Sequence, residues 1–200
     1  MAYGNVVNQI HGTGGDMKPR VLIGVTGGIA AYKTADVVSQ LVKADCDVRV
    51  IMTEAATRFV APLTFAALTR QKVITSIFPD TASGSDDVIY PHLYPASDAD
   101  AFAVIPATAD AIAKIAHGLG DDIVCCSALS LKADCKRIFC PAMNVQMWEQ
   151  PVVVENVRTM LKFGWHQVGP EQGRLACGTI GYGRMSTPTV ITQIILNSVL

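Results

Sequence analysis

The sequence has little charge and few aromatic residues, and no basic or acidic stretch stands out. Of its 200 residues 16% are charged and 6% are aromatic, and the formal net charge is −1. Without a basic patch, the chain lacks the electrostatic footprint of a nucleic-acid-binding protein. No apolar run reaches the roughly 18 residues of a membrane span, and residues 1–19 contain no apolar segment of the signal-peptide kind. We therefore expect a cytoplasmic protein without nucleic-acid or membrane partners.

The six cysteines form no Cys-x-x-Cys pair, which argues against a zinc site and against a disulfide scaffold. Four of them lie in apolar surroundings, where a reduced thiol packs as a small hydrophobic group. We expect no bound metal. Cys177 differs because glycines surround it and Arg174 and Arg184 are close in the sequence, an electropositive setting that favours a thiolate.

What the chain has in quantity is apolar residues, which make up 50% of the sequence. A chain of this length suits one well-buried domain, and its apolar content predicts a substantial core or a sizeable subunit interface in addition. Residues 1–19, polar and rich in glycine, are expected to form a disordered leader. The domain is expected to run from residue 20 to residue 200.

Short apolar runs that suit buried strands alternate with helical patterns about five times. The runs lie at 21–25, 47–52, 101–105, 138–140 and 165–168. Such alternation predicts an α/β fold in which helices cover both faces of a parallel sheet. Pro106 and Pro141 are expected to end their strands, because proline has no N–H for the ladder. Residues 171–185 read as a long Gly-rich loop, and loops of this length are usually functional, often as lids.

The first strand leads through Thr26-Gly27-Gly28-Ile29 into a helix, a layout that presents backbone N–H groups to an anion. It is not one of the common nucleotide motifs. Gly-x-Gly-x-x-Gly is absent, and the near match to a P-loop has Tyr32 where the second glycine belongs. A nucleoside triphosphatase is therefore not expected.

Three polar residues, Thr53, Thr108 and Asn144, follow other predicted strands, and His92 precedes the strand at 101–105. Thr53 suits either a phosphate contact or an ordinary helix N-cap, and Asn144 suits either a ligand contact or a cap of the next helix. Thr108 can cap a helix whose N-terminal N–H groups face a ligand. His92 stands alone between Pro91 and Leu93, and a lone histidine is more often structural or solvated than catalytic. Because ligands bind at the carboxyl ends of parallel strands, the loops with Gly, Thr and Asn are expected to meet at one site.

Four motifs, in this order along the chain, are similar to those of the flavin-dependent cysteine decarboxylases. They are Thr26-Gly27-Gly28-Ile29-Ala30-Ala31-Tyr32-Lys33, Pro106-Ala107-Thr108-Ala109, Pro141-Ala142-Met143-Asn144-x-x-Met147-Trp148 and Leu175-Ala176-Cys177-Gly178. The similarity extends from Arg20 to about Pro188. It is strongest to the branch of the family that acts on phosphopantothenoylcysteine in coenzyme A biosynthesis.

The resemblance implies a three-layer, flavodoxin-like (Rossmann-like) subunit that binds FMN at a subunit interface of a homotrimer, which in some members assembles further into a dodecamer. It implies that Asn144 and Met147 bind a small-molecule substrate, that His92 is the active-site histidine, and that Cys177 is the proton donor on a flap formed by residues 171–185. The residues that would contact FMN are Gly27, Gly28, Ile29, Thr53, Phe59, Thr108, Ala109, Asp110, Ala111 and Ala142.

The residue types suit the chemistry that the resemblance implies. A cysteine carboxylate has no adjacent electron sink, so the flavin first takes a hydride equivalent and leaves a thioaldehyde, which accepts electrons as carbon dioxide departs. The hydride then returns, and the Cys177 thiol supplies a proton. Asn144 can bind the carboxylate without adding a cation that would stabilise the ground state, while His92 assists thiol deprotonation.

Two alternatives and one departure accompany this interpretation. A peptidyl-cysteine decarboxylase of the same family would stop at the enethiol, but such enzymes typically lack the flap cysteine. A non-catalytic regulatory flavoprotein is the other alternative, against which the set of His92, Asn144 and Cys177 argues. Asp110 and Ala111 stand where the family usually has Asn and Thr, which brings an acidic group towards the flavin.

Overall fold

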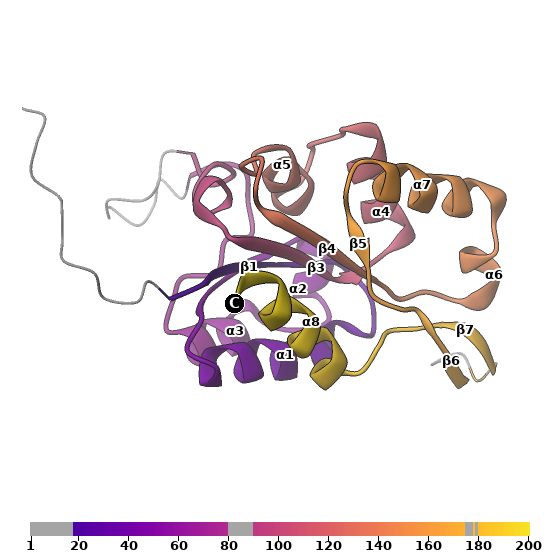
Figure 1. The fold of residues 1–200 in the computed structure, drawn as a ribbon, viewed down its shortest axis with the longest axis horizontal. Coiled ribbons are helices and arrows are strands. Elements are labelled where there is room, and N and C mark those ends of the chain that lie inside the picture. The colour runs from indigo at the N-terminus through magenta and orange to yellow at the C-terminus, as the bar shows by residue number, and fades with distance from the viewer. Residues whose placement is uncertain (1–17, 80–89, 175–177, 179) are drawn as a thin grey trace, which may run out of the picture.

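The sheet of the computed structural model has five parallel strands in the order β2-β1-β3-β4-β5 (Figure 1). The structure describes residues 18–79, 90–174, 178 and 180–200, so most of the predicted leader lies outside it. The strands are β1 (Arg20–Val25), β2 (Asp47–Met52), β3 (Ala101–Ala107), β4 (Lys136–Pro141) and β5 (His166–Gln167). This sheet confirms the predicted α/β class.

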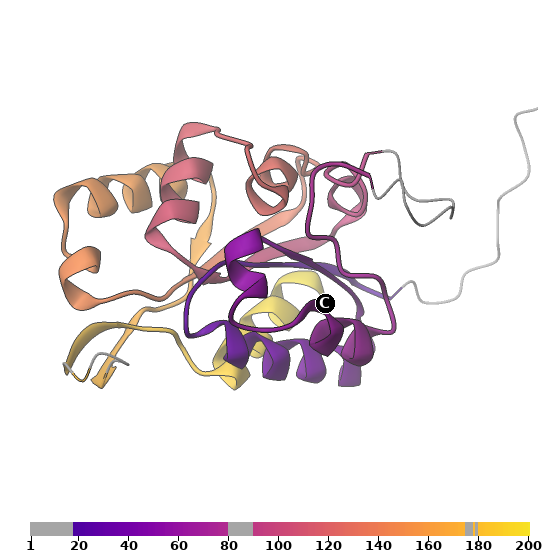
Figure 2. The same cartoon turned by 180° about the vertical axis from the view of Figure 1, so that it is seen from behind.

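Helices cover both faces of the sheet and make a three-layer molecule (Figures 1 and 2). One face carries α1 (Ala31–Lys43), α3 (Pro62–Thr69) and α8 (Pro188–Val199). The other carries α4 (Ala109–His117), α5 (Ile123–Leu129) and α7 (Pro151–Lys162). The short helices α2 (Glu54–Thr57) and α6 (Val145–Trp148) and the 3-10 turn η1 (Ala96–Asp98) lie in the connections.

Alternating side chains along the strands build a separate apolar core on each face. In β1, Ile23 and Val25 pack with α1 and α8, whereas Leu22 packs on the opposite face. Gly24 belongs to that opposite face, and a Cβ there would lie 2.8 Å from Val124. The glycine therefore lets α5 approach the sheet closely.

The amino ends of three strands are fastened together by Asp100. Its carboxylate accepts hydrogen bonds from the Arg20 backbone N–H at 2.8 Å and from the Lys132 ammonium at 2.9 Å. Its backbone carbonyl accepts a third, from the Lys136 N–H at 2.9 Å. Burial alone would raise the pKa of Asp100, but the Arg20 N–H and Lys132 outweigh it and hold the pKa below its ordinary value.

Of the two expected strand ends, the one at Pro106 was wrong and the one at Pro141 was confirmed. β3 does not end at Ile105 but continues through Pro106 to Ala107, and the register shifts between Val104 and Ala107. The missing N–H of the proline is accommodated at this irregularity. β4, in contrast, ends at Pro141 as expected, and Pro141 pairs with Ala107 at the end of β3.

The Gly-rich segment expected as a loop contains a two-stranded antiparallel hairpin of β6 (Glu171–Arg174) and β7 (Ile180–Arg184). It lies beside α6 at one end of the molecule (Figures 1 and 2). Within the described part of the chain, no helix has the length and apolar character that crossing a membrane requires.

Candidate functional site

A cleft of about 1120 Å³ opens at the carboxyl ends of β1, β2, β3 and β4, with the hairpin on one side. Every predicted site residue that the structure describes lines it, except Phe59 and His92. The loops that follow widely separated strands therefore meet at one place, as expected for an open parallel sheet.

The loop after β1 presents bare backbone to this cleft. A Cβ on Gly28 would have only the Thr108 methyl group within 4 Å, at 3.8 Å, so the space before it is open. A side chain at Gly27 would collide with α2, because a Cβ there would lie 2.5 Å from the Cβ of Ala55. The first turn of α1 carries no acidic residue. An open glycine before a helix N-terminus free of acidic side chains suits a phosphate group.

Thr53, for which the sequence allowed two roles, and Thr108, predicted as a cap, are both helix N-caps. Thr53 Oγ1 accepts a hydrogen bond from the N–H of Ala56 at 3.2 Å, and Thr108 Oγ1 accepts one from Ala111 at the same distance. Each also lines the cleft. The caps fix the orientation of both hydroxyls, and each oxygen keeps a proton that can be donated to a ligand.

Thr26, absent from our predicted set, joins the first and third loops beneath the cleft. Its side chain is buried, donates to the carbonyl of Pro106 at 2.7 Å and accepts from the N–H of Thr108 at 3.2 Å. The sequence signals for it were a hydroxyl between an apolar strand and a glycine, and its place at the start of the first family motif. Thr26 positions the loop that carries Thr108.

Lys114 and Asp122 also line the cleft without having been predicted. The Lys114 ammonium lies 3.2 Å from both Asp110 and Asp121 and 3.6 Å from Asp122. Burial alone would lower the pKa of Lys114, but hydrogen bonds to Asp110 and Asp121 outweigh it and raise that pKa. The acidic residue that departs from the family pattern, Asp110, is therefore matched by a cation.

Asn144 meets both expectations from the sequence, since it caps a helix and also lines the cleft. It is the N-cap of α6, where its Oδ1 accepts the N–H of Gln146 at 2.8 Å, and it also lines the cleft. Because the oxygen serves the cap, the N–H groups of the amide are the part suited to an anionic ligand. Met147, one turn later in the same short helix, is 47% exposed and lines the cleft too.

Two predicted residues that the structure describes, Phe59 and His92, do not line this cleft. Cys177 lies outside the described residues, and Phe59 is 51% exposed without lining the cleft. His92 is also absent from the lining, and its buried Nδ1 forms no hydrogen bond with any described residue.

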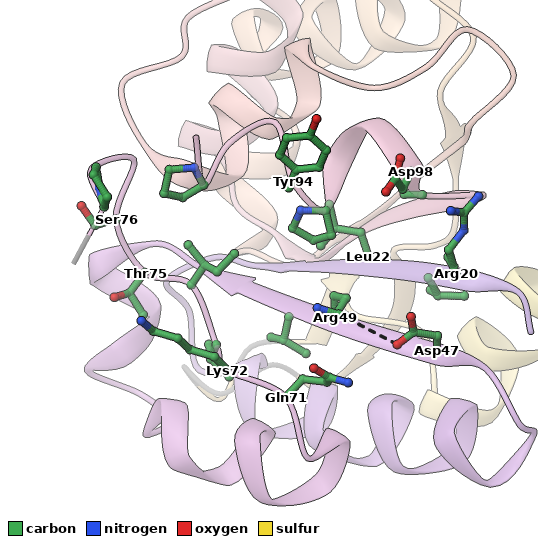
Figure 3. Close-up of a pocket in the computed structure, with 18 of the residues that line it drawn as sticks. Arg20, Leu22, Asp47, Arg49, Gln71, Lys72, Thr75, Ser76, Tyr94 and Asp98 are labelled. Carbon is green, nitrogen blue, oxygen red and sulfur yellow. Dashed lines mark hydrogen bonds and ion pairs between the residues drawn. The ribbon is translucent and has the colours of Figure 1, made fainter. Parts of the chain in front are cut away.

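The neighbours of His92 border a different cavity of about 630 Å³, shown in Figure 3. Pro91 and Tyr94 line it together with Arg20 and Asp47, the first residues of β1 and β2. This second cavity therefore reaches the amino ends of strands whose carboxyl ends form the cleft. Of His92 and Asn144, only Asn144 lines the cleft at the carboxyl ends of the strands.

Residues 11–200 match the protein family described as Flavoprotein. The chain is 37% identical over 177 residues to a probable phosphopantothenoylcysteine decarboxylase of Streptococcus mutans, covering 88% of this chain and 97% of that protein. It is 41% identical over 174 residues to the coenzyme A biosynthesis bifunctional protein CoaBC of Bacillus subtilis. That match covers 87% of this chain but only 41% of the bifunctional protein.

Solved structures of cysteine decarboxylases are similar to this chain as well. A mutant PPC decarboxylase complexed with pantothenoylaminoethenethiol superposes with a TM-score of 0.78 at 26% identity, covering 90% of this chain and 98% of that one. The FMN-dependent cysteine decarboxylase SpaF superposes with a TM-score of 0.73 at 26% identity, covering 91% and 98%. The family match over most of the chain, with the glycine loop and Asn144 in one cleft, shows that the chain belongs to the Flavoprotein family.

Proposed function

We propose that this chain catalyses the FMN-dependent decarboxylation of 4'-phosphopantothenoylcysteine to 4'-phosphopantetheine, a cytoplasmic step of coenzyme A biosynthesis. The observation that carries the proposal is that one cleft is lined both by a glycine loop with open space for a phosphate group and by Asn144. It occurs in a chain that is similar to a probable phosphopantothenoylcysteine decarboxylase along nearly the whole of that protein.

The residues present fit FMN. The backbone at Gly27, Gly28 and Ile29 and the hydroxyls of Thr53 and Thr108 would hold its phosphate and polar atoms, because all lie in the cleft and both hydroxyls have fixed orientations. Ala109, Ala111 and Ala142 would leave room for the ring system. FMN supplies a reversible hydride acceptor, which a cysteine carboxylate needs because it has no electron sink of its own.

Asn144 binds the substrate carboxylate through its N–H groups, with Met147 packed beside it. A neutral donor suits this position, since a cation would stabilise the carboxylate and oppose the loss of carbon dioxide. His92 takes the proton from the substrate thiol, and Cys177 returns a proton to the carbon that lost the carboxylate. The hairpin side of the cleft limits the access of water to the reacting carbon.

His92 reaches the cleft from a neighbouring copy of the chain in a homotrimer, which can assemble further into a dodecamer. Two observations support this arrangement. His92 does not line the cleft of its own subunit, and large apolar side chains are exposed both near the cleft and near His92. They are Ile29, Tyr32 and Phe59 on the cleft side and Tyr90 and Tyr94 on the His92 side, with exposed fractions of 50–60%. Apolar surface of this kind marks interaction sites.

The test is an assay of the purified protein by mass spectrometry, after its visible spectrum has been recorded for bound flavin. We expect a yellow protein that converts phosphopantothenoylcysteine to phosphopantetheine with release of carbon dioxide. Asn144→Asp is the matched control: aspartate still caps α6 but has no N–H to offer, so flavin should remain bound while turnover falls roughly 100-fold or more.

Three other results would contradict the proposed function. Turnover only of a peptide with a carboxyl-terminal cysteine would assign the chain to peptide modification. A yellow protein without turnover of either substrate would indicate a regulatory flavoprotein, and a colourless protein that takes up no FMN would refute the cofactor assignment.

A further inference from the structure

The hairpin is fastened directly against the loop that carries Asn144. The N–H of Met143 donates to the carbonyl of Gly183 at 3.0 Å, and a Cβ on Gly183 would lie 2.2 Å from the Met143 oxygen. A Cβ on Gly181 would lie 3.0 Å from Val145. The backbone of β7 thus lies against residues 143–145, and the residue after Gly183, Arg184, becomes part of the cleft wall.

The side chain of Arg184 is held in place from two directions. Its Nη2 donates to Glu171 Oε2 at 2.8 Å across the hairpin. A Cβ on Gly173 would lie 2.9 Å from Nε and 3.0 Å from Cζ, so the guanidinium rests on bare backbone. Glu171 is its one ion-pair partner within the described ranges. A guanidinium has five N–H donors, so this bond leaves others for an anion.

Four other cations line the cleft: Lys33, Arg58, Lys114 and Arg174. Lys33 lies in the first turn of α1, beside the loops proposed to hold the cofactor, and Arg174 at the end of β6 forms no ion pair with a described residue that would fix its side chain. Lys114 is surrounded by three carboxylates. Arg58 pairs with Glu54 and follows β2, close to the loops proposed to hold the cofactor. Arg184 instead belongs to the strand that touches the Asn144 loop, and so to the substrate side of the cleft.

The proposed substrate, on which this inference rests, carries two anionic groups: a carboxylate and a phosphate. A cation at the carboxylate would oppose its loss, and Asn144 already supplies neutral donors for it. The phosphate, in contrast, gains from a fixed guanidinium, which can bind it through two parallel hydrogen bonds. We propose that Arg184, positioned by Glu171 and Gly173, binds the substrate phosphate and sets the preference for the phosphorylated substrate.

The experiment compares phosphopantothenoylcysteine with its unphosphorylated counterpart, pantothenoylcysteine, as substrates of the FMN-loaded protein. For Arg184→Gln we expect the KM of the phosphorylated substrate to rise roughly 10- to 100-fold, with kcat within about twofold of wild type. The KM of pantothenoylcysteine should not change. Gly173→Ala should produce the same pattern with the charge retained, because its methyl group displaces the guanidinium.

Arg158→Gln is the control, since it removes another arginine–carboxylate pair, with Glu155 on the exposed face of α7. It should alter neither KM. An equal loss on both substrates in Arg184→Gln would show a structural role and overturn the inference, as would loss of bound FMN or a wild type that does not distinguish the two substrates. If wild type turns over neither, the proposed function itself is wrong.

Discussion

At the scale of single residues, the cleft depends on hydrogen bonds that join distant parts of the chain. Thr26 is the clearest case, since its partners at Pro106 and Thr108 are 80 and 82 residues away. The sequence could indicate polar residues at strand ends, because each strand is a local pattern. It could not indicate this pairing, which exists only once β1 and β3 lie side by side.

We predict that Thr26→Val destabilises the protein by about 2 kcal/mol and weakens FMN binding. Valine has nearly the same shape but removes the hydroxyl that pairs with the buried carbonyl of Pro106 and the partly buried N–H of Thr108. Urea unfolding and FMN titration measure the two effects. Thr26→Ser keeps the hydroxyl and should retain most of both properties; if serine and valine behave alike, the hydrogen bonds are not responsible.

At the scale of elements, strands and helices with clear apolar periodicity could be predicted from the sequence, whereas the hairpin could not. Residues 171–185 have no alternating apolar pattern, because their strands are stabilised by docking against Met143 and Val145 and by the pair of Glu171 with Arg184. The continuation of β3 through Pro106 was missed for a related reason. Its register irregularity is set by the neighbouring strand.

Asp100 joins the amino ends of β1, β3 and β4. Because its carboxylate takes part, we expect the stability of the protein to depend on pH. The pKa of this carboxyl is lowered in the folded protein. Its charged form therefore stabilises the fold above its ordinary pKa of 3.8, and this contribution is lost as the pH falls below that value.

We expect Asp100→Asn to reduce the free energy of unfolding by about 1 kcal/mol at pH 7, a figure discounted for the partial exposure of the carboxylate. In urea unfolding, the difference from wild type should shrink as the pH is lowered through about 4. Asp134→Asn is a suitable control, because Asp134 is 79% exposed and 3.9 Å from the same lysine. A difference that stays constant with pH would rule out the charge as its cause.

At the scale of the whole molecule, the separation of His92 from the cleft is the main result that the sequence could not supply. The motifs indicate which residues act together, but motif order along a chain does not say whether they act within one copy. The second cavity beside His92 shows that its segment packs towards the amino ends of β1 and β2.

A proposed trimer with shared sites predicts complementation between two inactive variants. When His92→Asn and Asn144→Asp chains are co-expressed with different affinity tags, each mixed trimer should contain about one intact site in three. Mixed trimers purified through both tags should thus recover roughly a third of wild-type turnover. If His92 acted within its own subunit, they would be inactive despite bound FMN.

The edges of the sheet have a consequence for how copies of this chain associate. β5 is only two residues long, and β2 is bridged by the following segment, where Ile74 exchanges backbone hydrogen bonds with Val50 and Met52. Neither edge offers a long row of open backbone groups on which a strand from another molecule could grow. Association through side chains can close into a ring of fixed size, whereas strand addition would continue into fibres. The short β5 and the bridge at β2 therefore disfavour edge-to-edge aggregation and leave the other surfaces available for assembly.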